Sequence, residues 1–150
     1  MQIISLYKCE NQSYWLEEIK KCEWSAGRLL YDLINENRFF ELAGRSSEVL
    51  LLVDDDKLVS FCTFAQKDEI DTEEYSPWVG FVYTFPEYRG HRYFGRLLER
   101  AKQLAKERGR PRLYISTDHI GLYEKYGFEY LTQMKSIYGD MARVYVKDIL

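Results

Sequence analysis

The chain has 150 residues, which is the length of one domain, so we expect a single domain over residues 1–150. Hydrophobic residues make up 46% of the sequence and charged residues 30%, which excludes a disordered or fibrous protein and is typical of a globular one. The longest apolar run, Val49 to Val53, is too short to cross a bilayer. The first ten residues lack the basic and apolar regions of a secretory signal. The sequence therefore predicts a cytoplasmic protein with no membrane contact.

The net charge is −3, but the charged residues are unevenly distributed along the chain. Residues 89–112 contain nine Lys and Arg and two Asp and Glu, a local charge of +7, which leaves −10 for the rest of the chain. A basic block within an acidic protein favours a local anionic ligand over a nucleic-acid surface. A solvated helix face explains the charge equally well.

The cysteines and histidines do not indicate a metal or disulfide framework. Cys9, Cys22 and Cys62 are widely separated and form no C-x-x-C pair, so neither disulfides nor a zinc site is expected. His91 and His119 are too isolated to suggest a metal centre. We therefore expect no metal.

The first part of the chain predicts a strand, two helices and a β-hairpin. Gln2–Tyr7 is rich in strand-forming residues, and Ser13 and Ser25 are candidate N-caps of two helices. The apolar positions that recur at helical spacing in these helices are Trp15, Leu16, Ile19 and Cys22, and then Leu29, Leu30, Leu33 and Ile34. Glu48–Val53 and Lys57–Ala65, joined by a polar turn of three aspartates, predict the hairpin.

The second part predicts an acidic loop, a central strand and the clearest helix of the chain. Lys67–Ser76 is the loop, and the aromatic segment Trp78–Phe85 is the strand, which Pro86 ends. Apolar residues recur at helical spacing over Arg92–Arg108. The remaining predicted elements are a strand at Leu113–Thr117, a short helix at 118–126, and strands at Phe128–Ile137 and Ala142–Val146. The predicted fold class is mixed α/β (α+β), with helices around one sheet.

The junction at residues 82–98, VYTFPEYRGHRYFGRLL, is where a function can be argued. A strand stops, a short basic turn follows, and a long helix begins, so the first N–H groups of the helix lack partners. These donors, the helix dipole and the nearby arginines favour phosphate binding, and Gly90 allows a close backbone approach. Neither G-x-x-x-x-G-K-[ST] nor G-x-G-x-x-G is present, which disfavours ATP and NAD.

Two segments resemble motifs of the GNAT superfamily of N-acetyltransferases. PEYRGHRYFGRLLERA is similar to the acyl-CoA-binding motif R/Q-x-x-G-x-G/A, with Arg89 on its first position and Arg92 and Phe94 in place of its two small residues. GLYEKYGF, residues 121–128, resembles the L-Y-x-x-x-G-F segment of the family. Two motifs in the right order, about 30 residues apart, are more specific than either alone. The resemblance implies a mostly antiparallel sheet whose strands splay at an acyl-CoA cleft.

The resemblance also implies a donor site for acetyl-CoA. Its pyrophosphate is expected on Arg89–Gly95, its pantetheine arm along Val82 and Thr84, and Tyr123 is expected to act as the general acid for the departing thiolate. The cofactor-binding residues predicted in this way are Val82, Tyr83, Thr84, Arg89, Gly90, His91, Arg92, Tyr93, Phe94, Gly95 and Arg96.

The expected reaction is direct attack of a primary amine, from a small molecule or a peptide, on acetyl-CoA in a ternary complex. The acidic segment Asp68–Glu74 indicates a cationic acceptor. The candidate general bases are Glu69, Asp71, Asp118 and His119. The aromatic residues that line the acceptor pocket or pack in the core are Trp24, Trp78 and Phe81.

Other functions remain open at this stage. The chain could be a non-catalytic acyl-CoA-binding or protein-interaction module on the same fold, which acetyl transfer would distinguish. A nucleic-acid contact on the basic helix, not expected here, would show a steep salt dependence. A monomer and a homodimer are equally compatible with the sequence.

Overall fold

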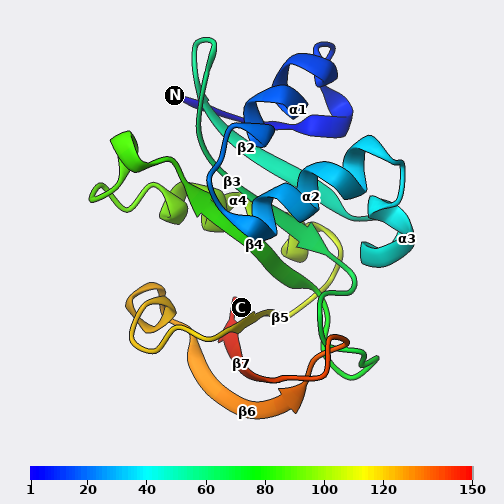
Figure 1. Ribbon diagram of the computed structural model, residues 1–150. Helices are drawn as coiled ribbons and strands as arrows, with labels where there is room; N and C mark the ends of the chain where they lie inside the picture. The colour runs from blue at the N-terminus through cyan, green and yellow to red at the C-terminus, as the bar shows by residue number, and fades with distance from the viewer. Residues whose placement is uncertain (150) are drawn as a thin grey trace.

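The computed structural model describes residues 1–149 and has one seven-stranded sheet, in the order β1-β2-β3-β4-β5-β7-β6 (Figure 1). Every pair of neighbouring strands is antiparallel except β4 and β5, which are parallel. The strands are β1 Gln2–Ser5, β2 Glu48–Asp54, β3 Lys57–Ala65, β4 Trp78–Thr84, β5 Arg112–Thr117, β6 Glu129–Lys135 and β7 Met141–Asp148. The predicted class, a mixed and mostly antiparallel sheet with flanking helices, is confirmed.

Helices cover both faces of this sheet. Their bounds are α1 Gln12–Lys20, α2 Ser25–Asn35, α3 Phe39–Ala43 and α4 Phe94–Glu107, with short 3₁₀ turns η1 Leu6–Lys8, η2 Pro86–Tyr88 and η3 Tyr123–Tyr126. The first three helices lie on one face and α4 on the other (Figure 1). No helix within residues 1–149 has the length and apolar character needed to cross a membrane.

The two faces are built by simple alternation along β2. Val49, Leu51 and Val53 pack into the cluster that contains α1, α2 and α3, whereas Leu50 and Leu52 pack into the cluster that contains α4. Side chains of a strand alternate between the two faces of a sheet, so a strand covered on both sides is apolar at every position. This explains why β2 appears in the sequence as a continuous apolar run.

The sheet opens between β4 and β5. Their only pairing is Trp78 with Tyr114, at the start of β4, and the two strands diverge beyond it (Figure 1). In the same strand, the pairing with β3 shifts register between Phe61 and Thr63, and Phe81 has a left-handed φ of 48°. Such a bulge bends a strand and redirects its side chains. The bulge therefore lies where the strand begins to leave its neighbour.

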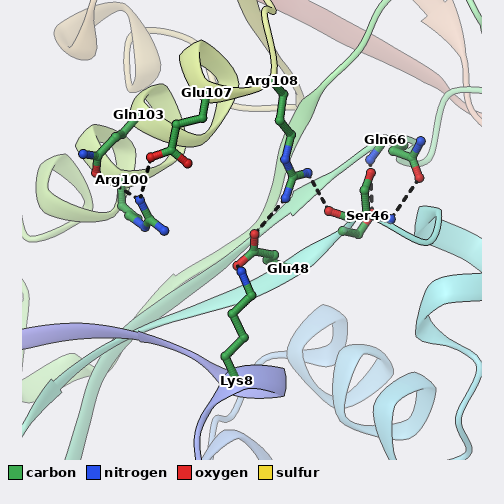
Figure 2. A network of polar contacts seen from close by, with 9 residues as sticks. Lys8, Ser46, Glu48, Gln66, Arg100, Gln103, Glu107 and Arg108 are labelled. Atoms are coloured by element: carbon green, nitrogen blue, oxygen red, sulfur yellow. Dashed lines mark hydrogen bonds and ion pairs between the residues drawn. The ribbon is translucent and has the colours of Figure 1, made fainter.

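The far end of α4 is tied to β2 by a buried carboxylate (Figure 2). The Glu48 side chain is only 6% exposed, and its Oε2 accepts a hydrogen bond from Arg108 Nη2 at 2.8 Å. Lys8 Nζ lies 3.5 Å from Glu48 Oε1, and Arg108 Nη1 donates to the carbonyl of Ser46 at 2.6 Å. These contacts fix the C-terminal end of α4, so that its N-terminal end is held against the opening between the strands.

Two helix boundaries differ from prediction. The helix predicted over Arg92–Arg108 begins at Phe94, because Arg92 has a φ of 56°, which a right-handed helix cannot contain. The short helix predicted over 118–126 is only the 3₁₀ turn at its end. Thr117 Oγ1 accepts the N–H of His119 at 3.0 Å, and this side-chain bond competes with helical pairing.

The N-terminal predictions also need correction. The strand predicted over Gln2–Tyr7 ends at Ser5, and α1 and α2 begin at Gln12 and Ser25 without a side-chain cap, so Ser13 and Ser25 are not N-caps. Leu29 is 38% exposed instead of lying on the buried face of α2, and α3 was not predicted. The remaining predicted strands occur, Lys57–Ala65 with the predicted bounds and the others with bounds shifted by at most two residues.

Candidate functional site

A cleft of about 680 Å³ lies where β4 and β5 diverge; we call it the β4–β5 cleft. Nine residues predicted to bind the cofactor or act in catalysis line it together: Val82, Tyr83, Thr84, Arg89, Gly90, Arg92, Tyr93, Phe94 and Tyr123. Three other predicted cofactor residues, His91, Gly95 and Arg96, are not among its lining residues. His91 is exposed with its ring 5.3 Å from that of Tyr93, and Arg96 points to solvent on α4.

The turn before α4 presents a row of backbone donors. None of the N–H groups of residues 90–94 donates to a backbone carbonyl in the described part of the chain. The N–H groups of Gly95 and Arg96, in contrast, are used within the first turn of the helix, on the carbonyls of Arg92 and Tyr93. The unpartnered donors lie in the turn and at the first residue of a 14-residue helix, whose dipole adds positive potential. Free N–H groups at a helix N-terminus are suited to anions, phosphate in particular.

The backbone of this turn explains the two small residues of the motif. Gly90 has φ 91°, and Arg92, which replaces a glycine of the motif, has φ 56°. A left-handed conformation costs a non-glycine residue about 1–2 kcal/mol, so Arg92 is held there by the turn around it. Phe94 replaces the second small residue and is 5% exposed, with its ring 5.7 Å from that of Tyr123. Its bulk therefore supports Tyr123 from the core.

The divergent edge of β4 faces the β4–β5 cleft with backbone groups. Tyr83 pairs with β3, and the N–H of Phe85 donates to Val59, so alternation turns the backbone groups of Val82 and Thr84 toward the open edge. Arg89 Nε donates to the Thr84 carbonyl at 2.8 Å, and its guanidinium lies 5.4 Å from the centre of the Tyr83 ring. Arg89 is thereby fixed at the rim of the cleft, beside the free N–H groups.

Tyr123 is a largely buried residue that also lines the β4–β5 cleft. It is 7% exposed and is held by the 3₁₀ turn that precedes Gly127. Burial raises the pKa of Tyr123 above its ordinary value, with smaller contributions from Cys62 and Tyr126. The hydroxyl therefore keeps its proton at neutral pH, as a proton donor must.

A second cavity of about 190 Å³ lies beyond the bulge of β4; we call it the small pocket. Gly80 and Phe81 line the small pocket, whereas the next residue, Val82, lines the β4–β5 cleft, and Trp24 contributes to both. The two cavities thus approach each other at the bulge, on either side of one strand. Trp78 is fully buried, in agreement with core packing, one of the two predicted alternatives for this residue.

Only two of the four candidate bases line a cavity. Glu69 lines the small pocket, and its Oε1 accepts a hydrogen bond from Ser116 Oγ at 2.6 Å. His119 lines the β4–β5 cleft. Asp71 and Asp118 are exposed and line neither cavity.

The prediction missed Asp68, which also lines the small pocket. Burial raises the pKa of its carboxyl to about 7, with a further contribution from the charge of Glu69, against a backbone hydrogen bond that lowers it. Its position does have a signal in the sequence, because Gly80 lies inside a strand and a strand glycine often marks a close approach. A Cβ atom on Gly80 would lie 2.4 Å from Asp68 Oδ1.

The splayed sheet and the anion-binding turn define an acyltransferase architecture. Across residues 1–149 no group of three or more His, Cys, Asp or Glu is arranged to hold a metal ion. The profile of the acetyltransferase (GNAT) family matches residues 8–128, and the chain belongs to this family of acyltransferase enzymes. The family indicated by the two motifs is thus confirmed.

Solved structures agree on the fold over the whole length. An aminoglycoside 6'-N-acetyltransferase from Enterococcus faecium has a TM-score of 0.71 at 15% identity, over 100% of this chain and 98% of that one. An acetyltransferase from Streptococcus agalactiae 2603 has a TM-score of 0.68 at 20% identity, over 98% and 97%. An aminoglycoside 6'-N-acetyltransferase complexed with coenzyme A has a TM-score of 0.67 at 14% identity, over 100% and 98%. Such identities establish the fold alone, and no curated protein sequence matches the chain.

Proposed function

We propose that the protein transfers an acetyl group from acetyl-CoA to a primary amine by direct attack in a ternary complex. One observation supports this proposal above the others. The β4–β5 cleft, with its turn of free N–H groups, and the acidic small pocket both border the bulge of β4, so that a donor in one cavity and an amine in the other would approach each other there.

The donor occupies the β4–β5 cleft in this proposal. The diphosphate of CoA accepts hydrogen bonds from the N–H groups of residues 90–94, with Arg89 and Arg92 adding charge-assisted contacts. The pantetheine arm extends along the open edge of β4 and pairs with the backbone of Val82. Coenzyme A bound to one structural neighbour supports the same donor here.

The reaction needs a neutral amine, an oriented thioester and a proton for the thiolate. The amine nitrogen attacks the thioester carbon, a C–N bond forms, and the C–S bond breaks as the thiolate takes a proton from the Tyr123 hydroxyl. Tyr123 is reprotonated by solvent. An ammonium ion and acetyl-CoA thus give an amide, the free thiol of CoA and one proton. General acid catalysis of this kind typically contributes 10²–10⁴-fold to the rate.

Donor binding can be tested by thermal denaturation. We expect acetyl-CoA to raise the melting temperature, because a ligand that binds only the folded state stabilises it, and we expect ATP and NAD not to do so. Arg89→Ala should reduce the affinity for CoA more than Lys106→Ala, which removes the same charge near the other end of α4. The loss of one charged hydrogen bond corresponds to about 1.5–3 kcal/mol. Absence of any shift at saturating acetyl-CoA would refute the donor assignment.

A non-catalytic acyl-CoA-binding module is the alternative that this binding test does not separate. The acidic small pocket favours the enzyme, because a module that only bound CoA would not need a second cavity next to the acyl group. Appearance of free CoA thiol that depends on an added amine distinguishes the two.

A further inference from the structure

We propose that the small pocket binds the ammonium group of the acceptor between Asp68 and Thr63, with the Asp68 carboxylate as the base that takes its proton. This inference rests on the proposed function and adds to it a residue and a class of acceptor. The acceptor class is a primary amine on a compact aliphatic or aromatic body.

Two side-chain oxygens converge on the bare face of Gly80. A Cβ atom built there would lie 2.4 Å from Asp68 Oδ1 and 3.2 Å from Thr63 Oγ1, so both oxygens occupy the space beside this glycine. Thr63 is 1% exposed and its hydroxyl has no hydrogen-bond partner among the described residues. A buried polar atom without a partner is costly unless something fills its place. An ammonium ion, with three donors, can satisfy both oxygens.

The acidic loop that carries Asp68 is held firmly over the pocket. The carbonyl of Glu69 accepts the N–H of Ile137 at 2.7 Å, and its carboxylate accepts the hydroxyl of Ser116 at 2.6 Å. Ile70, the next residue, is 2% exposed and packs in the core. The position of Asp68 is therefore set by contacts of the adjacent Glu69 with β5 and with the turn between β6 and β7.

The groups around Asp68 fit a base that works near neutral pH. Glu69 and Lys67 from its own loop and Tyr138 from the turn between β6 and β7 line the same pocket. Burial, with a smaller contribution from the charge of Glu69, raises the pKa of Asp68 to about 7. The charges of Glu69 and Asp68 also raise the pKa of Tyr138, behind the effect of burial, so Tyr138 stays neutral. A base with this pKa is half ionised near pH 7.

The proton balance of the step is simple. The ammonium gives one proton to the Asp68 carboxylate, which later passes it to solvent. The neutral nitrogen attacks the thioester carbon next to the bulge at Phe81, and the second proton leaves the nitrogen of the tetrahedral adduct to water. The thiolate leaves with a proton from Tyr123.

The walls of the pocket determine the acceptor class. Apart from its charged and hydroxyl side chains, the lining of the small pocket is mainly aliphatic and aromatic. Trp24, Leu29, Leu42 and Phe81 are among these apolar residues. A polyhydroxylated body would lose hydrogen bonds to water against such walls, at a cost of the order of 1–3 kcal/mol per unpaired group. A second ammonium is not required, because a single one contacts both Asp68 and Thr63.

The experiment measures release of CoA thiol from acetyl-CoA with 2-phenylethylamine or kanamycin as the probe amine, between pH 6 and pH 9.5. We expect 2-phenylethylamine to have the larger kcat/KM, with a limb that rises through about pH 7 as the base ionises. Asp68→Asn should lower kcat/KM about 100-fold or more at pH 7 and abolish that limb, with the loss shrinking at high pH, where the free amine is abundant. Glu73→Gln, an exposed carboxylate on the same loop, is the matched control and should behave as the wild type.

A second variant distinguishes a role of the small pocket in amine binding from a general loss of structure. Gly80→Ala places a methyl group where the Asp68 carboxylate lies and should raise KM for the amine several-fold, while the thermal shift by acetyl-CoA is retained. The inference is overturned if 2-phenylethylamine is not acetylated although acetyl-CoA binds, if kanamycin is preferred, or if Asp68→Asn keeps the rate and pH profile of Glu73→Gln. If acetyl-CoA does not raise the melting temperature of the wild type, the proposed function itself is overturned. This outcome is distinct from the three above, in which acetyl-CoA binds.

Discussion

Replacement of Asp68 by asparagine should make the protein more stable, in a manner that depends on pH. The pKa of its carboxyl is about 7 in the folded protein, against an ordinary value of 3.8. Between these two values the folded protein binds a proton that the unfolded chain has released. The free energy of unfolding of the wild type therefore falls as the pH rises from about 4 to about 7, and this contribution is constant above that range.

The size of the effect follows from the pKa difference. Each unit corresponds to about 1.4 kcal/mol, so the gap between 3.8 and about 7 destabilises the wild type by about 4 kcal/mol once Asp68 is ionised in the folded state. Asparagine has almost the same shape and does not titrate. The difference in free energy of unfolding between Asp68→Asn and the wild type should therefore be near zero at about pH 4 and about 4 kcal/mol in favour of the variant at about pH 8.

Urea denaturation of both proteins across this pH range measures the difference directly. Asp71→Asn, on the same loop but exposed, serves as the control and should show no such growth with pH. A difference between Asp68→Asn and the wild type that stays constant from pH 4 to pH 8 would refute the reasoning, because the carboxyl would then have an ordinary pKa. The confirmed pattern would mean that the wild type gives up stability to keep a base in the small pocket, as functional sites commonly do.

Two further predictions concern the other buried polar groups. Tyr123→Phe should leave the affinity for CoA unchanged in calorimetric titration and lower kcat about 100-fold or more. The loss should be smaller for an acyl donor whose thiol leaves more easily. Turnover equal to that of the wild type would show that the ring only packs against Phe94. Arg108→Met should lower the free energy of unfolding by about 2–3 kcal/mol, because it leaves the Glu48 carboxylate buried with Lys8 alone, whereas Arg110→Met on the exposed chain beyond α4 should change it little. Adding Glu48→Gln to Arg108→Met should recover part of that loss, and a double variant as unstable as the sum of the two single ones would argue against the ion pair.

The residues proposed for the donor side share one cleft, and this grouping could be predicted because its signals are local. Strand end, basic turn and helix start are consecutive in the sequence, and the unpartnered N–H groups of residues 90–94 belong to that one stretch. The structure places Arg89, Gly90 and Arg92 together in the β4–β5 cleft. The left-handed φ of Arg92 was not predictable, because helical periodicity carries no information about the residue that precedes the first turn.

The acceptor side depends on contacts between distant segments. The sequence shows that Asp68–Glu74 is acidic, but it does not indicate which of these carboxylates enters a cavity and which remains in water. That choice is made by Ser116, 47 residues beyond Glu69, and by Ile137, whose N–H holds the carbonyl of Glu69. Leu29 shows the same limit, since helical spacing placed it in the core, whereas it lines the small pocket.

The sequence by itself determined the class of fold, the family and the turn expected to receive the donor phosphates, because periodicity and motif spacing act over a few adjacent residues. Only the tertiary structure decided which acidic side chains enter the small pocket, the proposed acceptor site. The open edge of β4, the bulge at Phe81 and the enclosure of Asp68 arise from pairing of β4 with β3 and from its separation from β5. Desolvation of a carboxyl depends on every atom that surrounds it, and those atoms come from strands and loops that the chain brings together only when it folds.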